Sequence, residues 1–244
     1  MEIRVFDSAD ETVLAVARRV ALALGNTPDL VLGLPAGRTP IGVYAELARL
    51  HAEGEVDFSH ARSFNVDEFV GIAPTHTASF HRFIAEHLLD RVNIRADRRH
   101  SLDGLAHDLD AECERYDSQL EQAGGVGLQL LGIGTNGHIG FNEPADALFA
   151  RTHRVALLET TRRDNAGLFG GNPSDVPHEA LSIGMGTILR SDVVLLVATG
   201  PGKATAVQGM VDGPITTRVP ASLLQVHRSI EVYLDRDAAS RLRS

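Results

Sequence analysis

The chain has 244 residues, 43% of them hydrophobic, which is enough for one substantial core, so we expect a single domain over residues 1–244. A formal net charge of −9, with arginines scattered along the chain, argues against a nucleic-acid-binding surface. The sequence has no leader-like N-terminus and no apolar run of membrane-spanning length, which favours a cytoplasmic protein without a membrane partner, and its single cysteine, Cys113, excludes an internal disulfide.

The N-terminal part of the chain alternates strand-like and helical patterns. A strand is expected over residues 2–6, and Ser8 with Glu11 matches a capping box for a helix that runs to about residue 24 and stops at Gly25. The next strand, over residues 30–34, leads into a turn in which Thr39 is expected to cap a helix whose first residue is Pro40.

The rest of the chain repeats this alternation. Strands are expected over residues 62–66, 128–132 and 193–199, each followed by a polar or glycine-rich loop, and residues 79–89 and 106–122 have helical apolar spacing. Alternating strands and helices are typical of stacked βα units. The sequence therefore predicts an α/β fold with a doubly wound, mostly parallel, Rossmann-like sheet and helices on both of its faces.

Residues that directly follow strands are the first candidates for function, because ligands of such sheets bind outside the carboxyl ends of the strands. Gly37-Arg38-Thr39 and Gly200-Pro201-Gly202-Lys203 each put small residues at a helix start, where free N–H groups and the helix dipole favour an anion. Lys203 is the chain's one lysine beside 22 arginines, and a bound phosphate explains its place better than helix stability does. The alternatives are a plain capped turn and a solvated lysine.

Two further clusters can move protons. Asp67 and Glu68 follow a strand, and neighbouring carboxylates can have their pKa values driven apart, although a helix cap or a solvated pair is the simpler alternative. The loop Gly134–Pro144 packs an imidazole, two amides and a carboxylate between glycines. A zinc site on His138 and Glu143 is disfavoured, because their spacing lacks the helical His-Glu-x-x-His pattern.

Several of these stretches resemble glucosamine-6-phosphate deaminases, and the likeness spans nearly the whole chain. It is carried by Leu32–Pro40, Phe64–Phe69 and Gly132–Pro144, and it continues in Val176–Gly186 and Pro220–His227. The ending Phe-Asn-Glu-Pro of the third stretch is the specific part, because the related 6-phosphogluconolactonases follow the shared Gly-x-Gly-His region differently. The resemblance implies conversion of glucosamine 6-phosphate to fructose 6-phosphate without a metal, flavin or nicotinamide.

The resemblance also implies roles for individual residues. Asp67 would accept the proton during enolisation, and His138 would promote opening of the pyranose ring with the assistance of Asn136 and Glu143. Some relatives have an aspartate in place of Asn136. An amide can orient His138 by hydrogen bonding, but it adds no negative charge.

The implied phosphate site departs from the family pattern. Lys203, the side chain of Thr39 and the amides of Gly37–Thr39 would hold the phosphate. Arg38 stands where the family's loop usually has a small or hydroxyl residue, and Gly167 stands where relatives supply a phosphate-binding arginine. We expect Arg38 to compensate from the opposite side, with Arg163 as the alternative.

Four other functions remain open. One is a deaminase for another amino sugar phosphate, such as galactosamine 6-phosphate, which differs at C4. A 6-phosphogluconolactonase is disfavoured because it has no use for a proton shuttle at Asp67. A non-catalytic sugar-phosphate-sensing domain would predict a basic helix-turn-helix ahead of the core, which the sequence lacks. The last alternative is a Schiff-base aldolase built on Lys203.

The segment Arg151–Val155 bears on regulation. Hexameric relatives that N-acetylglucosamine 6-phosphate activates carry two basic residues there, and the counterparts in this chain are His153 and Val155. Arg151 and Arg154 lie nearby, but successive side chains of a strand point to opposite faces. We therefore expect hyperbolic kinetics and a monomer or small homo-oligomer that binds a small-molecule substrate.

Overall fold

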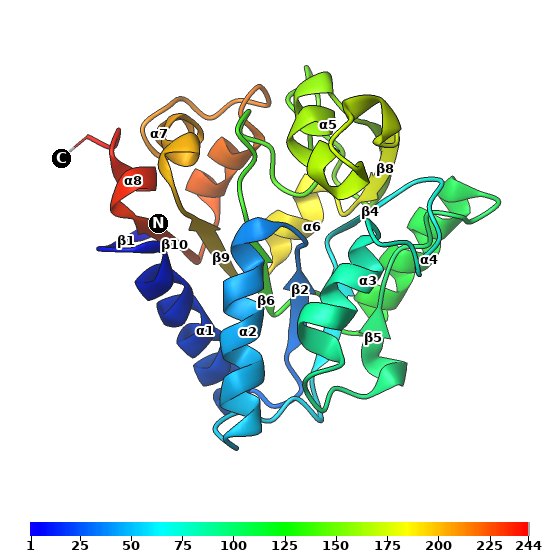
Figure 1. The fold of residues 1–244 in the computed structure, drawn as a ribbon, viewed down its shortest axis with the longest axis vertical. Helices are drawn as coiled ribbons and strands as arrows, with labels where there is room; N and C mark the ends of the chain where they lie inside the picture. Colours follow the sequence, from blue (N-terminus) through cyan, green and yellow to red (C-terminus); the bar gives the residue numbers. More distant parts are fainter. Residues whose placement is uncertain (244) are drawn as a thin grey trace.

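Two sheets organise residues 1–243, the part of the chain that the computed structural model describes (Figure 1). The main sheet has seven strands, and every neighbouring pair is parallel. Their order is β1 (Glu2–Phe6), β10 (Ile230–Asp235), β9 (Val193–Ala198), β6 (Leu128–Leu131), β2 (Val31–Leu34), β3 (Arg62–Asn65) and β5 (Arg99–His100). The small sheet is antiparallel, in the order β4 (Asp67–Phe69), β8 (Glu179–Ser182) and β7 (His153–Ala156).

Helices cover both faces of the main sheet. They are α1 (Ala9–Asn26), α2 (Arg38–Ala52), α3 (Phe80–Ile84), α4 (Leu109–Gln122), α5 (Glu159–Asn165), α6 (Met185–Arg190), α7 (Ala204–Val211) and α8 (Arg236–Ala239). A π-helical turn, Ala85–Leu89, continues α3, and short 3₁₀ turns occupy Ala166–Phe169, Pro173–Asp175, Pro201–Lys203 and Pro220–Val226. No helix within residues 1–243 is both long enough and apolar enough to span a membrane.

Two sequence predictions about helix starts have different outcomes. The cap on α1 is confirmed, because the Ser8 side chain accepts from the backbone N–H of Glu11 at 3.2 Å. The predicted cap on α2 is wrong: the helix begins at Arg38, ahead of Thr39, and its N-cap residue, Gly37, provides no side-chain acceptor. Gly37 has a φ of 127°, a conformation that glycine adopts without strain, so the chain can turn into the helix earlier than expected.

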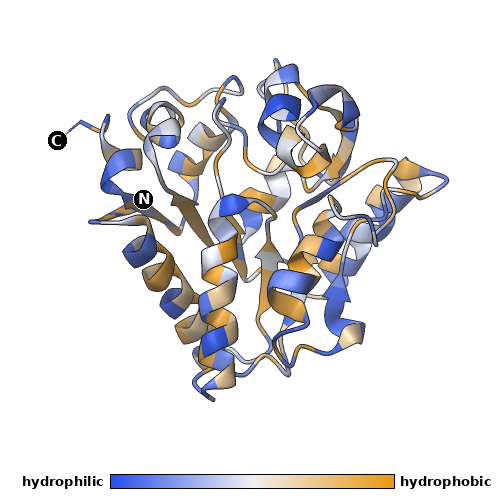
Figure 2. Cartoon of the chain, viewed as in Figure 1, coloured by the Kyte–Doolittle hydropathy of each residue, from blue (hydrophilic) through white to orange (hydrophobic). Residues whose placement is uncertain are grey.

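The predicted doubly wound architecture is confirmed by how the central strands divide their side chains. Along β9, Val194 and Leu196 enter one buried cluster with residues of α4, α6 and α7, whereas Leu195 and Val197 enter another with residues of α1, α2 and α3. Figure 2 shows the apolar colour concentrated on the central strands and on the helix faces that meet them. Because both faces are covered, these strands are continuous apolar runs.

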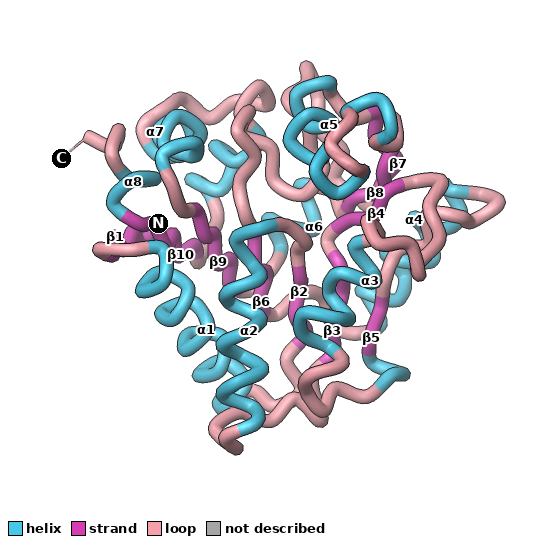
Figure 3. Tube along the Cα trace, in the orientation of Figure 1, coloured by secondary structure: helices cyan, strands magenta, loops and turns pink. Residues whose placement is uncertain are grey.

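The order in which strands are added to the sheet changes direction between the parallel neighbours β2 and β6. From β2 the chain proceeds outward through β3 to β5, and from β6 it proceeds the other way through β9 to β10. Loops that leave neighbouring strands in opposite directions open a crevice at the strands' carboxyl ends. The four strands that the sequence singled out by their loops are the neighbours β9, β6, β2 and β3, and Figure 3 shows loops and short helices gathered at this end.

The antiparallel small sheet was not predicted. After β3 the chain crosses from one sheet to the other through Val66, whose N–H donates to Leu34 in the main sheet and whose carbonyl accepts from Ile183 beside the small sheet. The next strand, β4, then packs Phe69 against Phe80 and Phe141, with ring centroids 4.8 and 5.3 Å away. This third apolar cluster fixes the small sheet over one side of the crevice.

Candidate active site

Asp67 is the first residue of β4, at the point where the chain leaves the main sheet, and it pairs with Ser182 of β8. It is only 6% exposed, and no group within residues 1–243 donates a hydrogen bond to its carboxylate. Burial, with a further contribution from the charge of Glu68, raises the pKa of the Asp67 carboxyl well above its ordinary value. Once ionised, such a carboxylate is a stronger base than a solvated aspartate.

Glu68 is buried as well, but its carboxylate accepts four hydrogen bonds. One oxygen accepts from the backbone N–H groups of Phe69 and Phe80 at 2.9 and 3.0 Å, and the other from the Ser79 hydroxyl and the N–H of His81 at 2.7 and 2.8 Å. Burial raises the pKa of Glu68 and these bonds oppose the rise. Glu68 therefore serves the start of α3, and Asp67 is the carboxylate left free for chemistry.

Two buried phenols flank Asp67. Burial raises the pKa values of Tyr44 and Tyr116 well above that of an ordinary tyrosine, and the charge of Asp67 raises each of them further. The Tyr44 hydroxyl donates to the carbonyl of Pro35, and the Tyr116 hydroxyl to that of Asn65, both at 2.6 Å. Helices α2 and α4 thus hold the backbone at the ends of β2 and β3, next to Asp67.

The loop after β6 brings three of the predicted residues into one cluster. The Nδ2 atom of Asn136 donates to Glu143 Oε2 at 3.0 Å, and its Oδ1 atom accepts from the backbone N–H of His138 at 3.1 Å. The imidazole Nδ1 atom of His138 lies 3.6 Å from Glu143 Oε2. The amide therefore orients the loop and the carboxylate, and it has no hydrogen bond to the imidazole ring.

Glu143 is buried, yet its environment favours the charged form. Burial raises the pKa of its carboxyl, but the neighbouring His138 imidazole, together with the polar groups of Thr161 and Asn136, outweighs that effect and lowers it. The N–H of Leu158 donates to the other carboxylate oxygen at 3.1 Å. An ionised carboxylate thus lies beside the imidazole.

Gly134 explains how the His138 ring can fold against its own loop. A Cβ atom on Gly134 would lie 2.3 Å from the nearest ring atom of His138, far inside van der Waals contact. The same loop is tied to the strand that pairs with that of Asp67, because Phe141 donates its N–H at 3.1 Å to the hydroxyl of Ser182, the residue opposite Asp67. The loop of the imidazole and the strand of the buried carboxylate therefore meet at the same residue of β8.

Cationic groups gather at the same end of the sheet. The ammonium of Lys203 donates to the carbonyl of Ile133, at the start of the histidine loop, at 2.6 Å. Burial lowers the pKa of Lys203. The charge of Asp164 raises this pKa and the charge of Arg38 lowers it further, so both groups lie close enough to Lys203 to act on its charge. Arg38 belongs to the first turn of α2, which has no side-chain cap. The arrangement suits a phosphate.

The alternative arginine points elsewhere. Arg163 forms an ion pair with Glu159, and both side chains are exposed. Gly167 lies in the turn Ala166–Phe169, and a Cβ atom placed on it would meet nothing within 4 Å. Of the two candidates for the missing arginine, Arg38 is the one whose charge acts on Lys203.

Two residues of α5 that contact this loop, Thr161 and Asp164, were not singled out in the sequence. The hydroxyl of Thr161 lies 3.4 Å from the Nδ1 atom of His138, and the hydroxyl of Thr135 donates to Asp164 at 2.8 Å. These contacts join α5 to the loop after β6 across 23 and 29 residues of chain. No local motif marks contacts made across such a separation.

Two other side-chain sets bear on metal and thiol chemistry. Within residues 1–243, no three His, Cys, Asp or Glu side chains converge to form a metal-binding group. Cys113 is buried in α4, where burial raises the pKa of its thiol to about 11. The thiol therefore stays protonated at neutral pH.

Comparisons with known proteins agree with this geometry. Residues 6–233 match the family model described as glucosamine-6-phosphate isomerases/6-phosphogluconolactonase. A protein of Halothermothrix orenii named glucosamine-6-phosphate deaminase is 45% identical over 236 residues, which cover 97% of this chain and 96% of the relative. A protein of Giardia intestinalis named glucosamine-6-phosphate deaminase 1 is 46% identical, over 97% of this chain and 88% of the relative.

Solved structures extend the comparison. One described as a monomeric glucosamine-6-phosphate deaminase superposes with a TM-score of 0.96 at 38% identity, covering 99% of this chain and 100% of the other. The 6-phosphogluconolactonase of Trypanosoma brucei superposes with a TM-score of 0.75 at 21% identity, over 99% and 98% of the two chains. The second likeness shows the fold alone.

The burial of Asp67 predicts a pH-dependent stability. A raised pKa in the folded state means that the protonated form stabilises the fold below the unfolded pKa of about 4, and that this stabilisation is lost as the pH rises through the folded pKa. Asp67→Asn should therefore raise the midpoint of thermal unfolding at pH 8, by about 2 to 4 °C for each kcal/mol added to the free energy of unfolding. The gain should shrink toward pH 4.

The matched control is Glu68→Gln. Because the amide nitrogen of Gln cannot accept, the two donors that now bond to one of the carboxylate oxygens would lose their acceptor, and this variant should have a lower midpoint than the wild type at pH 8. Thermal unfolding followed by circular dichroism at several pH values measures both. An Asp67→Asn variant less stable than the wild type at pH 8 would contradict the analysis.

Proposed function

The chain belongs to the family of glucosamine-6-phosphate isomerases and 6-phosphogluconolactonases, and we propose that it is an aldose–ketose isomerising deaminase that converts glucosamine 6-phosphate and water to fructose 6-phosphate and ammonia. The observation that carries the proposal is the buried, unpartnered carboxylate of Asp67 in one crevice with the His138 and Glu143 pair. Full-length identity of 38% to 46% links the chain to proteins named as deaminases, whereas the lactonase structures share only its fold.

Ring opening is the first task. The Nδ1 atom of His138 faces Glu143, so Nε2 is the nitrogen available to the sugar. It takes the proton of the anomeric hydroxyl and delivers it to the ring oxygen as the ring C–O bond breaks, which gives the open-chain aldehyde. The ionised Glu143 stabilises the imidazolium that forms.

Asp67 then moves a proton between adjacent carbons. Its carboxylate removes the C2 proton of the 2-ammonio aldehyde while the carbonyl oxygen gains a proton that the ammonium group gives up. The same carboxylate then returns its proton at C1, which leaves an iminium at C2. Water adds to C2, the nitrogen leaves as ammonia, and the ketone of fructose 6-phosphate remains. All these steps are proton transfers or water addition, so the proposal invokes no cofactor.

The phosphate end would supply binding energy that positions these carbons. Arg38, Lys203, Thr39 and the first-turn N–H groups of α2 form the anchor. An uncapped first turn and a desolvated ammonium both gain from an anion. The phosphate does not react, so its binding energy can hold C1 and C2 over Asp67.

Ammonia release tests the function directly. The chain should release ammonia from glucosamine 6-phosphate, with fructose 6-phosphate formed in equal amount, and not from N-acetylglucosamine 6-phosphate. Galactosamine 6-phosphate tests the C4 epimer, and hydrolysis of 6-phosphogluconolactone tests the lactonase alternative. Lactone hydrolysis without ammonia release would overturn the proposal, and a borohydride-trapped adduct on Lys203 would favour the aldolase.

The proton shuttle predicts a specific loss in Asp67→Asn. The amide cannot take the C2 proton, so kcat should fall about 100- to 10,000-fold. Binding of an unreactive phosphate ester should stay within about threefold, because the anchor is intact. In the wild type, the acid limb of the kcat profile should lie above the ordinary range of an aspartate, since the base must be ionised and its pKa is raised. Turnover above one-tenth of wild type, about 1.4 kcal/mol, would exclude Asp67 as the base.

The anchor predicts a loss of affinity without a loss of chemistry. Lys203→Ala and Arg38→Ala should each raise KM for glucosamine 6-phosphate by roughly 10- to 150-fold, which corresponds to one charge-assisted hydrogen bond of about 1.5 to 3 kcal/mol. The matched control is Arg163→Ala, whose guanidinium is paired with Glu159, and it should leave KM unchanged. A large rise in KM for Arg163→Ala, with no change for Arg38→Ala, would show that Arg163 and not Arg38 binds the phosphate.

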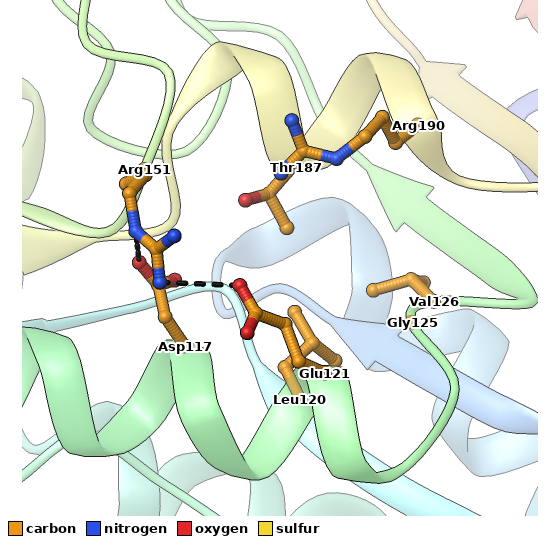
Figure 4. A pocket seen from close by; sticks show the side chains of 8 residues that line it. All are labelled: Asp117, Leu120, Glu121, Gly125, Val126, Arg151, Thr187 and Arg190. Atoms are coloured by element: carbon orange, nitrogen blue, oxygen red, sulfur yellow. Dashed lines mark hydrogen bonds and ion pairs between the residues drawn. The ribbon is translucent and has the colours of Figure 1, made fainter.

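In the segment Arg151–Val155, which corresponds to the one implicated in activation of hexameric relatives, both arginines form ion pairs with carboxylates of the same chain. Arg151 contacts Asp117 at 3.0 Å and Glu121 at 3.1 Å beside a cavity of about 70 Å3, as Figure 4 shows. Arg154 donates to both carboxylate oxygens of Glu179 at 2.9 and 2.7 Å. Burial lowers the pKa of His153, so its imidazole is neutral at neutral pH. Each arginine already has a carboxylate partner, which leaves a phosphate little to bind.

We therefore propose a cytoplasmic monomer or small homo-oligomer without this activation. The rate should depend hyperbolically on glucosamine 6-phosphate and should not respond to N-acetylglucosamine 6-phosphate, which has no differential affinity with which to shift an equilibrium. Initial rates with and without that compound, together with the mass in solution, test this. A sigmoidal curve made hyperbolic by the compound, and then abolished by Arg151→Ala or Arg154→Ala, would show that one of these arginines binds it.

A further inference from the structure

Thr161 turns a hydroxyl into the cluster around the imidazole from outside the loop that holds it. It lies in the first turn of α5, it is 1% exposed, and its backbone carbonyl is occupied by the side chain of Asn165 at 2.9 Å. Buried hydroxyls are nearly always hydrogen-bonded, and here the groups in reach are His138 and Glu143. The sequence motifs contain neither this residue nor any reason to choose it.

The distances place the hydroxyl nearer to the imidazole than the carboxylate is. The Oγ1 atom of Thr161 lies 3.4 Å from Nδ1 of His138, while the separation of Nδ1 from Glu143 Oε2 is 3.6 Å, too long for a hydrogen bond. Thr161 also helps to lower the pKa of the Glu143 carboxyl, so it stabilises the charged form of that group. Nδ1 therefore faces two acceptors, the Thr161 hydroxyl oxygen and the more distant carboxylate.

The direction of the protons follows from donor and acceptor chemistry. An ionised carboxylate only accepts, so Glu143, which lies on the Nδ1 side of the ring, favours the form in which Nδ1 carries the proton. The oxygen of the Thr161 hydroxyl is nearer to Nδ1 and can accept a hydrogen bond from it. Nε2 is consequently the unprotonated nitrogen, which is the one that ring opening requires as a base.

We propose that Thr161 is a positioning residue for His138: its hydroxyl accepts from Nδ1 and, together with the charge of Glu143, fixes the tautomer in which Nε2 takes the anomeric proton. The inference rests on the proposed function for its kinetic consequences and on the hydrogen-bond geometry for the tautomer. It also gives α5 a direct connection to the imidazole, which the loop after β6 cannot supply by itself.

The experiment compares three variants. Thr161→Val keeps the shape and removes the hydroxyl, Thr161→Ser keeps the hydroxyl, and Thr160→Val alters the exposed neighbour on the same helix turn. Thr161→Val should lower kcat for glucosamine 6-phosphate about 10- to 100-fold, as is usual when a partner behind a working histidine is removed. KM should change less than about twofold, and Thr161→Ser should recover kcat to within about threefold.

Two readouts separate positioning from a general structural effect. With 5-deoxyglucosamine 6-phosphate, which cannot close a pyranose ring, Thr161→Val should be within about threefold of wild type. The 15N chemical shifts of the His138 ring should show a proton on Nδ1 in the wild type and in Thr161→Ser, and a mixture of tautomers in Thr161→Val. The Thr160→Val variant should match the wild type in both.

Several outcomes would overturn the inference. Equal loss with the cyclic and the 5-deoxy substrate, no recovery in Thr161→Ser, or an unchanged tautomer in Thr161→Val would each do so. If the wild type releases no ammonia from glucosamine 6-phosphate, the proposed function fails, yet the ring shifts still decide the tautomer. A wild type that deaminates while Thr161→Val is unimpaired would retain the function and reject the role of Thr161.

Discussion

The site depends on the carboxylate of Asp67, which is buried without a hydrogen-bond donor from the described part of the chain. Asp67 and Glu68 are neighbours on β4, and both are buried, but four donors satisfy Glu68 while Asp67 has none within residues 1–243. Alternation along the strand sends their side chains to opposite faces. One face meets the start of α3 and the other the crevice. The same two residues thus give the fold a helix start and give the crevice its proposed base, and exchanging their surroundings would remove both.

The rest of the crevice is arranged around that carboxylate by the reversal of strand order. Because β2 and β6 are parallel neighbours from which the chain continues toward opposite edges of the sheet, the loop of Arg38 and the loop of His138 lie on either side of the opening. Lys203 arrives from β9 and bonds to Ile133 at the base of the histidine loop. Positive charge is therefore placed away from Asp67, whose base strength would fall if a cation lay against it. An anchor at one end and a desolvated base at the other follow from the topology.

How far the sequence predicts this structure depends on the range of each interaction. The four strands with informative loops, the Ser8 cap and the grouping of Asn136, His138 and Glu143 could be predicted, since each follows from residues close together in the chain. The Thr39 cap was wrong by a local detail, the positive φ of Gly37. The small antiparallel sheet could not be predicted, because Asp67 pairs with Ser182 across more than one hundred residues and periodicity does not encode partners. The contact of Thr161 with His138 was missed for the same reason.

The long-range contacts are also what make the local motif chemically competent. The loop after β6 supplies an imidazole, an amide and a carboxylate, but the amide of Asn136 bonds to the backbone of His138 and leaves its ring free. A neutral amide adds no charge, so the ring has one carboxylate beside it, at a distance too long for a direct bond. That ionised carboxylate favours a proton on Nδ1, the ring nitrogen that faces it. The hydroxyl that α5 places 3.4 Å from Nδ1 gives this proton a nearer acceptor, so a motif of thirteen consecutive residues is completed by a helix outside it.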